Sequence, residues 1–245
     1  MRFEGDGMRL DKAIAQNGLT RQMAKKAIAG GRARVNGKVI LDPGYLLKPE
    51  DEVLLDGENA RAPEHVHLML HKPAGFLTAT EDARGERTVL DLLPEKLRMR
   101  RVGPVGRLDK DVTGLLILTT DGQLAHRLIS PKWDVEKTYY AEIEGEIDDA
   151  CVRRFAEGVP LRDFTCKPAR LERAGAGACR VYVSEGKYHQ VKRMLAAVGH
   201  PVLRLKREKI GPVALDPALS EGAFRPLTPG EEAALYEIAG MTKHE

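Results

Sequence analysis

Strand-like and helix-like stretches alternate irregularly along most of this 245-residue chain, and this order is what most constrains its fold. Short apolar runs end at turn residues, whereas helical stretches repeat apolar residues at intervals of three or four. The predicted strands are 67–73, 115–122, 138–145, 179–186 and 200–215, and the predicted helices are 88–93, 122–128, 147–157, 188–198 and a last one from Thr228. Because no strict strand–helix–strand rhythm is present, we expect an α+β fold rather than a doubly wound sheet.

The first 56 residues form a pattern of their own. Residues 9–29 predict two short helices that are separated at Asn17-Gly18, and Thr20 is suited to cap the second helix. Asn36-Gly37 lies between two alternating runs, which predicts a β-hairpin with a type I′ turn. A strand at 52–55 precedes a polar stretch with proline and glycine. We therefore predict a small domain at 1–60, a linker at 61–66 and a larger domain at 67–245.

Composition excludes several classes of protein. The chain is 42% hydrophobic and 31% charged, so it can bury a core and is not expected to be disordered. It lacks an apolar run of about eighteen residues and an apolar N-terminal segment, which argues against a membrane span and a secretory signal. Three cysteines are too few and too widely spaced for a disulfide framework or a zinc site. We therefore expect a cytoplasmic protein without a membrane partner.

Positive charge is concentrated in three parts of the sequence, although the formal net charge is only +3. No acidic residue lies between Asp11 and Asp42, and two further basic blocks span 96–107 and 187–209. One basic block alone fits a solvated surface equally well, but three together favour a polyanionic partner.

Motifs for nucleotide or metal binding are absent or weak. The sequence contains neither GxxxxGK[ST] nor GxGxxG after a strand, so no nucleotide cofactor is expected. His65, His67 and His71 have no cysteine or carboxylate at metal-site spacing, and we interpret them as strand or surface residues. Asp109 and Asp111 are either a magnesium-binding pair or part of a turn before the next strand.

The small domain resembles the S4 RNA-binding domain. The resemblance lies in RLDKAIAQNG, TRQMAKKAIAGGRARVNGKVI, the Asp42-Pro43-Gly44 turn and the DEV segment that begins at Asp51. It implies that the second helix and the following loop lie on RNA, and a protein-binding module remains the alternative. The candidate RNA contacts in this domain are Arg21, Lys25, Lys26, Arg32, Arg34 and Lys38.

The segment GRLDKDVTGLLILTTDG, from Gly106 to Gly122, is similar to the catalytic motif of the RsuA/RluB group of rRNA pseudouridine synthases. Three further segments match motifs of that group in the same order, namely HKPAG at 71–75, EKTY at 136–139 and EGKYHQVKRM at 185–194. The resemblance covers essentially the whole chain. It implies a catalytic domain built on a mixed, mainly antiparallel sheet with flanking helices. It also implies isomerisation of uridine to pseudouridine without cofactor, nucleotide or metal.

The resemblance also assigns roles to single residues. Asp109 is the expected nucleophile, and Lys192 supplies the cation beside it where many relatives have arginine. Tyr139 is expected to stack on the base and to remove the C5 proton. Arg107 fills the gap left by the flipped nucleotide or holds the adjacent phosphate. The further RNA contacts expected in this domain are Lys72, Lys187, His189, Gln190 and Arg193.

The choice of RNA rests on finer similarities. SPKWDVEKTYY, GVPL with the later KPA, and YHQVKRMLAAVGH are closer to the small-subunit enzymes, which favours 16S rRNA, free or in an assembly intermediate. Three alternatives remain: a 23S rRNA synthase of the same group, a non-catalytic RNA-binding ribosome factor, and a magnesium-dependent nuclease using Asp109 and Asp111. We expect the protein to act as a monomer.

Overall fold

The computed structural model describes residues 8–15, 19–48, 50–60 and 65–241. The chain divides into two compact units, which we call unit 1 (Met1–Glu64 with Pro94–Arg101) and unit 2 (His65–Leu93 with Val102–Glu245). The predicted break at Asn17-Gly18 and most of the predicted linker lie outside the described residues. Across the described ranges, no helix is long and apolar enough to cross a membrane.

Unit 1 consists of short helices and small antiparallel sheets. Its elements are α1 (Leu10–Ala15), α2 (Arg21–Ala29), α3 (Glu95–Met99), a sheet of β3 (Lys38–Val39), β2 (Ala33–Val35), β5 (Val53–Leu55) and β6 (Glu58–Asn59), and the pair β1 (Met8–Arg9) and β4 (Leu46–Leu47). The Thr20 hydroxyl accepts from Met23 N at 3.2 Å, which confirms the predicted cap of α2. Asn36 and Gly37 both have positive φ, as a type I′ hairpin requires.

Unit 2 is built on one large sheet, and its strands run in the order β11-β12-β10-β13-β9-β7-β15. The strands are β7 (His67–Lys72), β8 (Gly103–Pro104), β9 (Thr113–Thr119), β10 (Lys137–Ile143), β11 (Arg170–Arg173), β12 (Ala178–Val183), β13 (Val202–Ile210), β14 (Val213–Ala214) and β15 (Phe224–Pro226). Every pairing is antiparallel except that of β13 with β9. The mixed, mainly antiparallel sheet and the α+β class are therefore confirmed.

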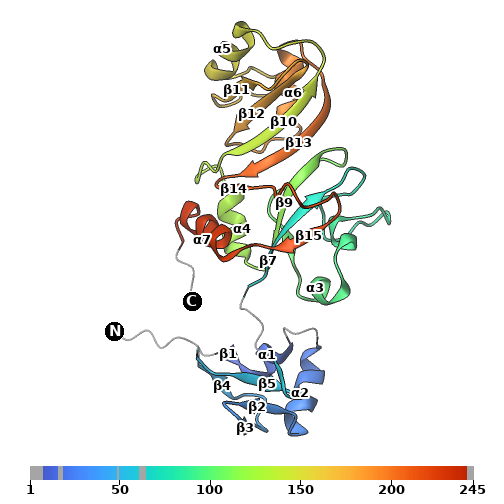
Figure 1. Ribbon diagram of the computed structural model, residues 1–245, viewed down its shortest axis with the longest axis vertical. Helices are drawn as coiled ribbons and strands as arrows, with labels where there is room; N and C mark the ends of the chain where they lie inside the picture. Colours follow the sequence, from blue (N-terminus) through green and yellow to red (C-terminus); the bar gives the residue numbers. More distant parts are fainter. Residues whose placement is uncertain (1–7, 16–18, 49, 61–64, 242–245) are drawn as a thin grey trace. The chain divides into compact units, whose positions relative to one another are not determined.

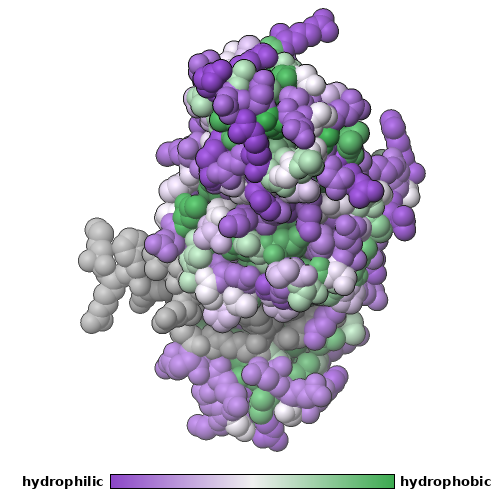
Figure 2. Space-filling view, turned by 45° about the horizontal axis from the view of Figure 1, so that its top comes forward, coloured by the Kyte–Doolittle hydropathy of each residue, from purple (hydrophilic) through white to green (hydrophobic). Residues whose placement is uncertain are grey.

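Two groups of helices cover different halves of this sheet (Figure 1). The helices of unit 2 are the 3-10 helix η1 (Val89–Leu92), α4 (Gly122–Ile129), α5 (Asp149–Glu157), α6 (Gln190–Ala197) and α7 (Pro229–Ile238). Helices α5 and α6 bury Phe155, Met194 and Leu195 against β10, β12 and β13, whereas α4 packs on α7 beside β7 and β9. Hydrophilic residues cover most of the face seen in Figure 2.

The two halves of the sheet meet where β13 lies parallel to β9. Gly114 has φ +110°, and a Cβ there would lie 2.3 Å from the carbonyl oxygen of Arg207, so this close approach requires glycine. The buried Arg207 donates through Nε to the Leu115 carbonyl at 2.8 Å. This pairing brings the loop before β9 next to β13, the strand that follows α6 in the chain.

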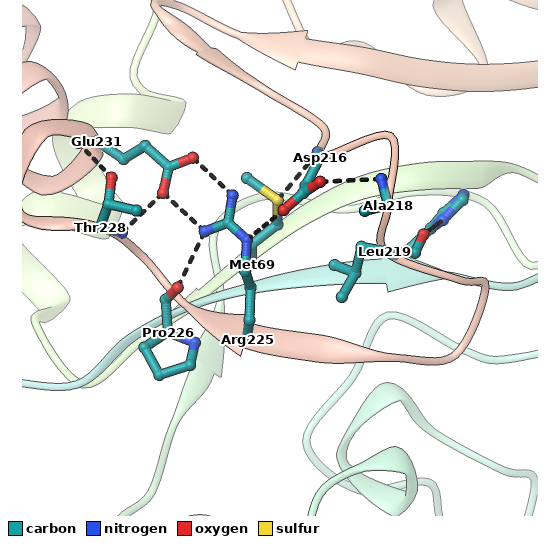
Figure 3. Close-up of polar contacts among 9 residues, drawn as sticks. Met69, Asp216, Ala218, Leu219, Arg225, Pro226, Thr228 and Glu231 are labelled. Atoms are coloured by element: carbon teal, nitrogen blue, oxygen red, sulfur yellow. Dashed lines mark hydrogen bonds and ion pairs between the residues drawn. The ribbon is translucent and has the colours of Figure 1, made fainter.

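Helix α7 is fixed at its N-terminus by a group of charged side chains (Figure 3). Arg225 donates to both oxygens of Glu231 at 2.8 and 2.9 Å and through Nε to Asp216 at 2.8 Å. Thr228 and Glu231 form the predicted capping box. The hydrogen bonds from Arg225 lower the pKa of Glu231 to about 2.

We expect Glu231→Gln to lower the free energy of unfolding by about 2 kcal/mol at neutral pH, because it removes a charged acceptor from both Arg225 and the helix cap. The pKa of Glu231 is below its usual 4.5, so this contribution is complete above pH 4.5 and is lost as the pH falls toward 2. Urea unfolding at pH 7 and pH 3 measures the effect. Glu237→Gln, an exposed position on the same helix, is the control. An equal loss for both variants would contradict the assignment.

Candidate active site

The loop before β9 carries Asp109 and is held from several sides. Val112 N donates to the Asp109 carbonyl at 3.1 Å, which closes a turn on the aspartate. The Thr78 hydroxyl donates to the Leu108 carbonyl at 2.7 Å and accepts from Leu108 N at 3.2 Å. These bonds fix the backbone on both sides of the carboxylate.

Lys72 supports the same loop from inside the protein. Its side chain is fully buried, and Nζ donates to the carbonyls of Val112 at 2.8 Å, Pro73 at 3.0 Å and Lys110 at 3.3 Å. Burial lowers the pKa of Lys72 to about 8, against the opposing charges of Asp111 and Asp109. The prediction that Lys72 contacts RNA is therefore wrong, because the ammonium has no exposed surface. It is a positioning residue for the Asp109 loop.

The Asp109 carboxylate lies between two basic side chains at the start of α6. Lys192 Nζ is 3.1 Å from Oδ2, and His189 Nε2 is 3.5 Å from Oδ1. His189 is the N-cap of α6 and Lys192 follows three positions later, so both project toward the same side. The Asp109 side chain keeps 30% of its surface exposed, which leaves it accessible to a substrate. The pairing with Lys192 is the one that the resemblance implied.

Lys192 also binds a second carboxylate, which the sequence interpretation did not pair with it. Its Nζ lies 2.7 and 2.9 Å from the two oxygens of Asp111. Burial opposes a charge on Lys192, but the hydrogen bonds that it donates to Asp111 and Asp109 outweigh burial and raise the pKa of the lysine. The hydrogen bond from Lys192 in turn lowers the pKa of Asp111. Among the described residues, no group of three or more metal-binding side chains is arranged to hold a metal ion.

Asp111→Asn is expected to lower kcat about tenfold with little change in KM. The reason is that the Lys192 ammonium loses the charged acceptor that holds it beside Asp109. Steady-state kinetics of the pseudouridine formation that the sequence resemblance implies measures this effect, with Asp149→Asn as the control at an exposed ion pair. A change confined to KM would show that Asp111 contacts RNA instead.

Tyr139 and Arg107 line the same cavity as Asp109. The cavity has a volume of about 70 Å³, and Lys192, His189 and Gln190 also line it. Tyr139 lies on β10 beside a β-bulge and is half-buried. Arg107 is exposed, two residues before the carboxylate. The structure thus brings the three predicted catalytic side chains and Arg107 to one shallow cavity.

The other predicted RNA contacts of unit 2 differ in their surroundings. Lys187 is exposed, whereas Arg193 pairs with Asp163 and lies over the Phe164 ring. Gln190 is buried: its side chain donates to Glu185 at 3.0 Å and accepts from Lys187 N at 3.0 Å. Both ends of its amide bind the protein although it lines the cavity, and the RNA contact of Gln190 stays a prediction.

All six basic side chains predicted to contact RNA in unit 1 are exposed, namely Arg21, Lys25, Lys26, Arg32, Arg34 and Lys38. Arg21 reaches the buried Asp11 at 3.4 Å, and Arg32 pairs with Asp56. Lys25 and Lys26 follow Arg21 on α2, and Arg34 and Lys38 lie on the hairpin strands. Their exposure leaves them accessible to a ligand, and their role in RNA binding stays a prediction.

Comparison with known proteins identifies the family. A family model described as RNA pseudouridylate synthase matches residues 66–197, and an S4-domain model matches residues 8–53. The chain belongs to the RNA pseudouridylate synthase family. Both resemblances noted in the sequence are therefore confirmed, and this synthase is an isomerase that acts on RNA.

Individual relatives extend over nearly the whole synthase. It is 44% identical over 234 residues to ribosomal small subunit pseudouridine synthase A of Escherichia coli strain K12, covering 93% of this chain and 100% of that protein. An uncharacterised RNA pseudouridine synthase of Bacillus subtilis is 43% identical over 94% of this chain and 99% of its own. The crystal structure of a pseudouridylate synthase superimposes with a TM-score of 0.67 at 40% identity, covering 93% of this chain and 99% of that one.

Proposed function

We propose that this synthase isomerises one specific uridine of 16S rRNA to pseudouridine, with Asp109 as the nucleophile. The observation that carries the proposal is the Asp109 carboxylate, partly exposed and paired with Lys192 in the cavity that Tyr139 lines. The small-subunit relative from Escherichia coli supports the choice of RNA.

The proposed reaction breaks one bond and forms another within a single nucleotide. Asp109 attacks C1′ of the ribose or C6 of the base, the C1′–N1 bond breaks, and the base turns over in the cavity. C5 then bonds to C1′, Asp109 is released, C5 loses its proton and N1 gains one. Tyr139 stacks on the base and accepts the C5 proton. Because no electrons enter or leave, the chemistry requires no redox cofactor.

A uridine stacked in an RNA helix must turn out of the stack to reach Asp109, because the carboxylate lies in the wall of a cavity and a stacked base is enclosed by its neighbours. Arg107 is exposed at the same cavity and fits the role of holding the displaced strand. The exposed cations of unit 1 bind flanking RNA without reading its sequence. We propose that the protein acts as a monomer in the cytoplasm, on free rRNA or on an assembly intermediate.

Mapping pseudouridine by primer extension in both rRNAs, from cells with and without this protein, tests the proposal. We expect one modified position in 16S rRNA that depends on the protein. A dependent position in 23S rRNA alone would assign the large-subunit activity instead. Bound but unmodified rRNA would favour a non-catalytic ribosome factor, and cleavage that EDTA suppresses would favour a nuclease.

A further inference from the structure

Tyr188 is the most exposed of the large apolar and aromatic side chains in the described part of the chain, at 73%. Its ring is stacked on that of His189, with centroids 3.8 Å apart and planes inclined by 18°. One face of the tyrosine is thus covered by a parallel ring, and the high exposure leaves the other face to solvent. Covering this exposed ring face with another ring would remove apolar surface from water, which is favourable.

The backbone holds this stacked pair in a defined place. His189 adopts φ +48° and ψ +31°, a left-handed conformation that is uncommon for a residue with a side chain. The surrounding hydrogen bonds impose it: Gln190 N donates to the Lys187 carbonyl at 3.2 Å, and Arg193 N donates to the His189 carbonyl at 2.9 Å. The buried Gln190 amide closes the same turn.

The pair is connected to the nucleophile by the edge of the imidazole. His189 Nε2 lies 3.5 Å from Asp109, while its ring face is covered by Tyr188. A ring on the outer face of Tyr188 would be two ring spacings from His189 along the stack. Tyr188 itself does not line the cavity of Asp109 and Tyr139, so we expect a ring stacked on it to lie beside the target base and not in its place.

Positive charge accompanies the exposed ring. Lys187, next in the chain, is exposed, and its ammonium lies 5.5 Å from the Phe164 ring. Arg107 is exposed at the same cavity. Proteins bind unpaired nucleotides by stacking aromatic side chains on the bases and by attracting the phosphates with nearby cations, and this part of unit 2 offers both.

We infer that the Tyr188–His189 pair is a stacking platform for the base next to the target uridine. The inference rests on the proposed function, since it takes the nucleotide at Asp109 to be the target. The base is held by its π-face, so the platform fixes the strand beside the cavity whatever the identity of that base.

Affinity for protein-free 16S rRNA tests the platform in an Asp109→Asn background, which removes turnover. Tyr188→Leu keeps an apolar side chain without a ring, whereas Tyr188→Phe and Tyr188→Trp keep the ring. We expect the leucine variant to bind about tenfold more weakly and the two aromatic variants to bind within about twofold of Tyr188, since base stacking on an aromatic ring has an effect of this order. Thermal unfolding should be the same for all variants, because the side chain is exposed.

A 2-aminopurine placed beside the mapped uridine reports the stacking directly. Its fluorescence should be quenched on binding to the tyrosine and phenylalanine forms and much less by the leucine form. Equal rRNA affinity of the leucine and phenylalanine forms would overturn the inference, as would equal quenching. The proposed function is tested by a different result: it fails if the protein with Asp109 intact forms no pseudouridine. The affinity comparison between the leucine and phenylalanine forms would still show whether the Tyr188 ring binds RNA.

Discussion

Replacement of Asp109 by asparagine is expected to lower pseudouridine formation by about four orders of magnitude or more while rRNA binding is retained. The amide has nearly the shape of the carboxylate but is not a nucleophile, so the covalent step is lost. Lys192 keeps Asp111 as its partner at 2.7 and 2.9 Å, which preserves the local geometry. Single-turnover conversion of 16S rRNA, together with filter binding, measures the two properties separately.

The matched control for this experiment is Asp111→Asn. It removes the same charge two positions away and leaves the proposed nucleophile in place. If the two variants lost activity equally, the lysine and its two carboxylates would act as one charged group, and no single nucleophile would be indicated. If Asp109→Asn retained substantial conversion, the assignment of Asp109 would be wrong.

Local signals in the sequence predicted those elements whose causes are local. The Asn36-Gly37 turn and the capping box at Thr228 depend on residues within a few positions of each other, and both formed as expected. The run 200–215 was predicted as one strand, but Gly211, with φ +51°, divides it into β13 and β14. Strand β15 was missed because it has three residues and ends in proline.

The site was predictable where its residues lie in matched motifs, as the pairing of Asp109 with Lys192 shows. The error at Lys72 concerns a residue whose surroundings are set by distant segments. Lysine mostly lies at the surface, yet Lys72 is fully buried. The sequence also carried no sign that Tyr188 is exposed beside the cavity. Only the folded chain shows that Lys72 meets the carbonyl of Val112, forty positions away.

Removal of the buried ammonium in Lys72→Met is expected to lower kcat at least about a hundredfold, the largest effect we expect from a residue outside the cavity. In the Asp109 loop the Val112 carbonyl loses this donor and the Lys110 carbonyl keeps the Gly75 N–H at 2.7 Å, and a small displacement of a nucleophile has effects of this order. The free energy of unfolding should fall by about 2 kcal/mol because the buried Val112 carbonyl loses its donor. Single-turnover kinetics and urea unfolding measure the two effects.

The role of Lys72 in activity and its contribution to stability depend on pH in opposite directions, so measurements at several pH values separate them. The pKa of Lys72 is about 8 in the folded chain and 10.5 as its ordinary value, so the unfolded state binds more protons between these values. This lysine therefore makes the fold relatively more stable as pH rises from about 8 to 10.5. Activity should fall over the same range, because a neutral amine has two hydrogens for three carbonyls. Lys137, whose pKa burial also lowers to about 8, is the matched control. The loss of activity at alkaline pH should persist in Lys137→Met and be absent in Lys72→Met. If both variants lost activity over this pH range, titration of Lys72 would not be its cause.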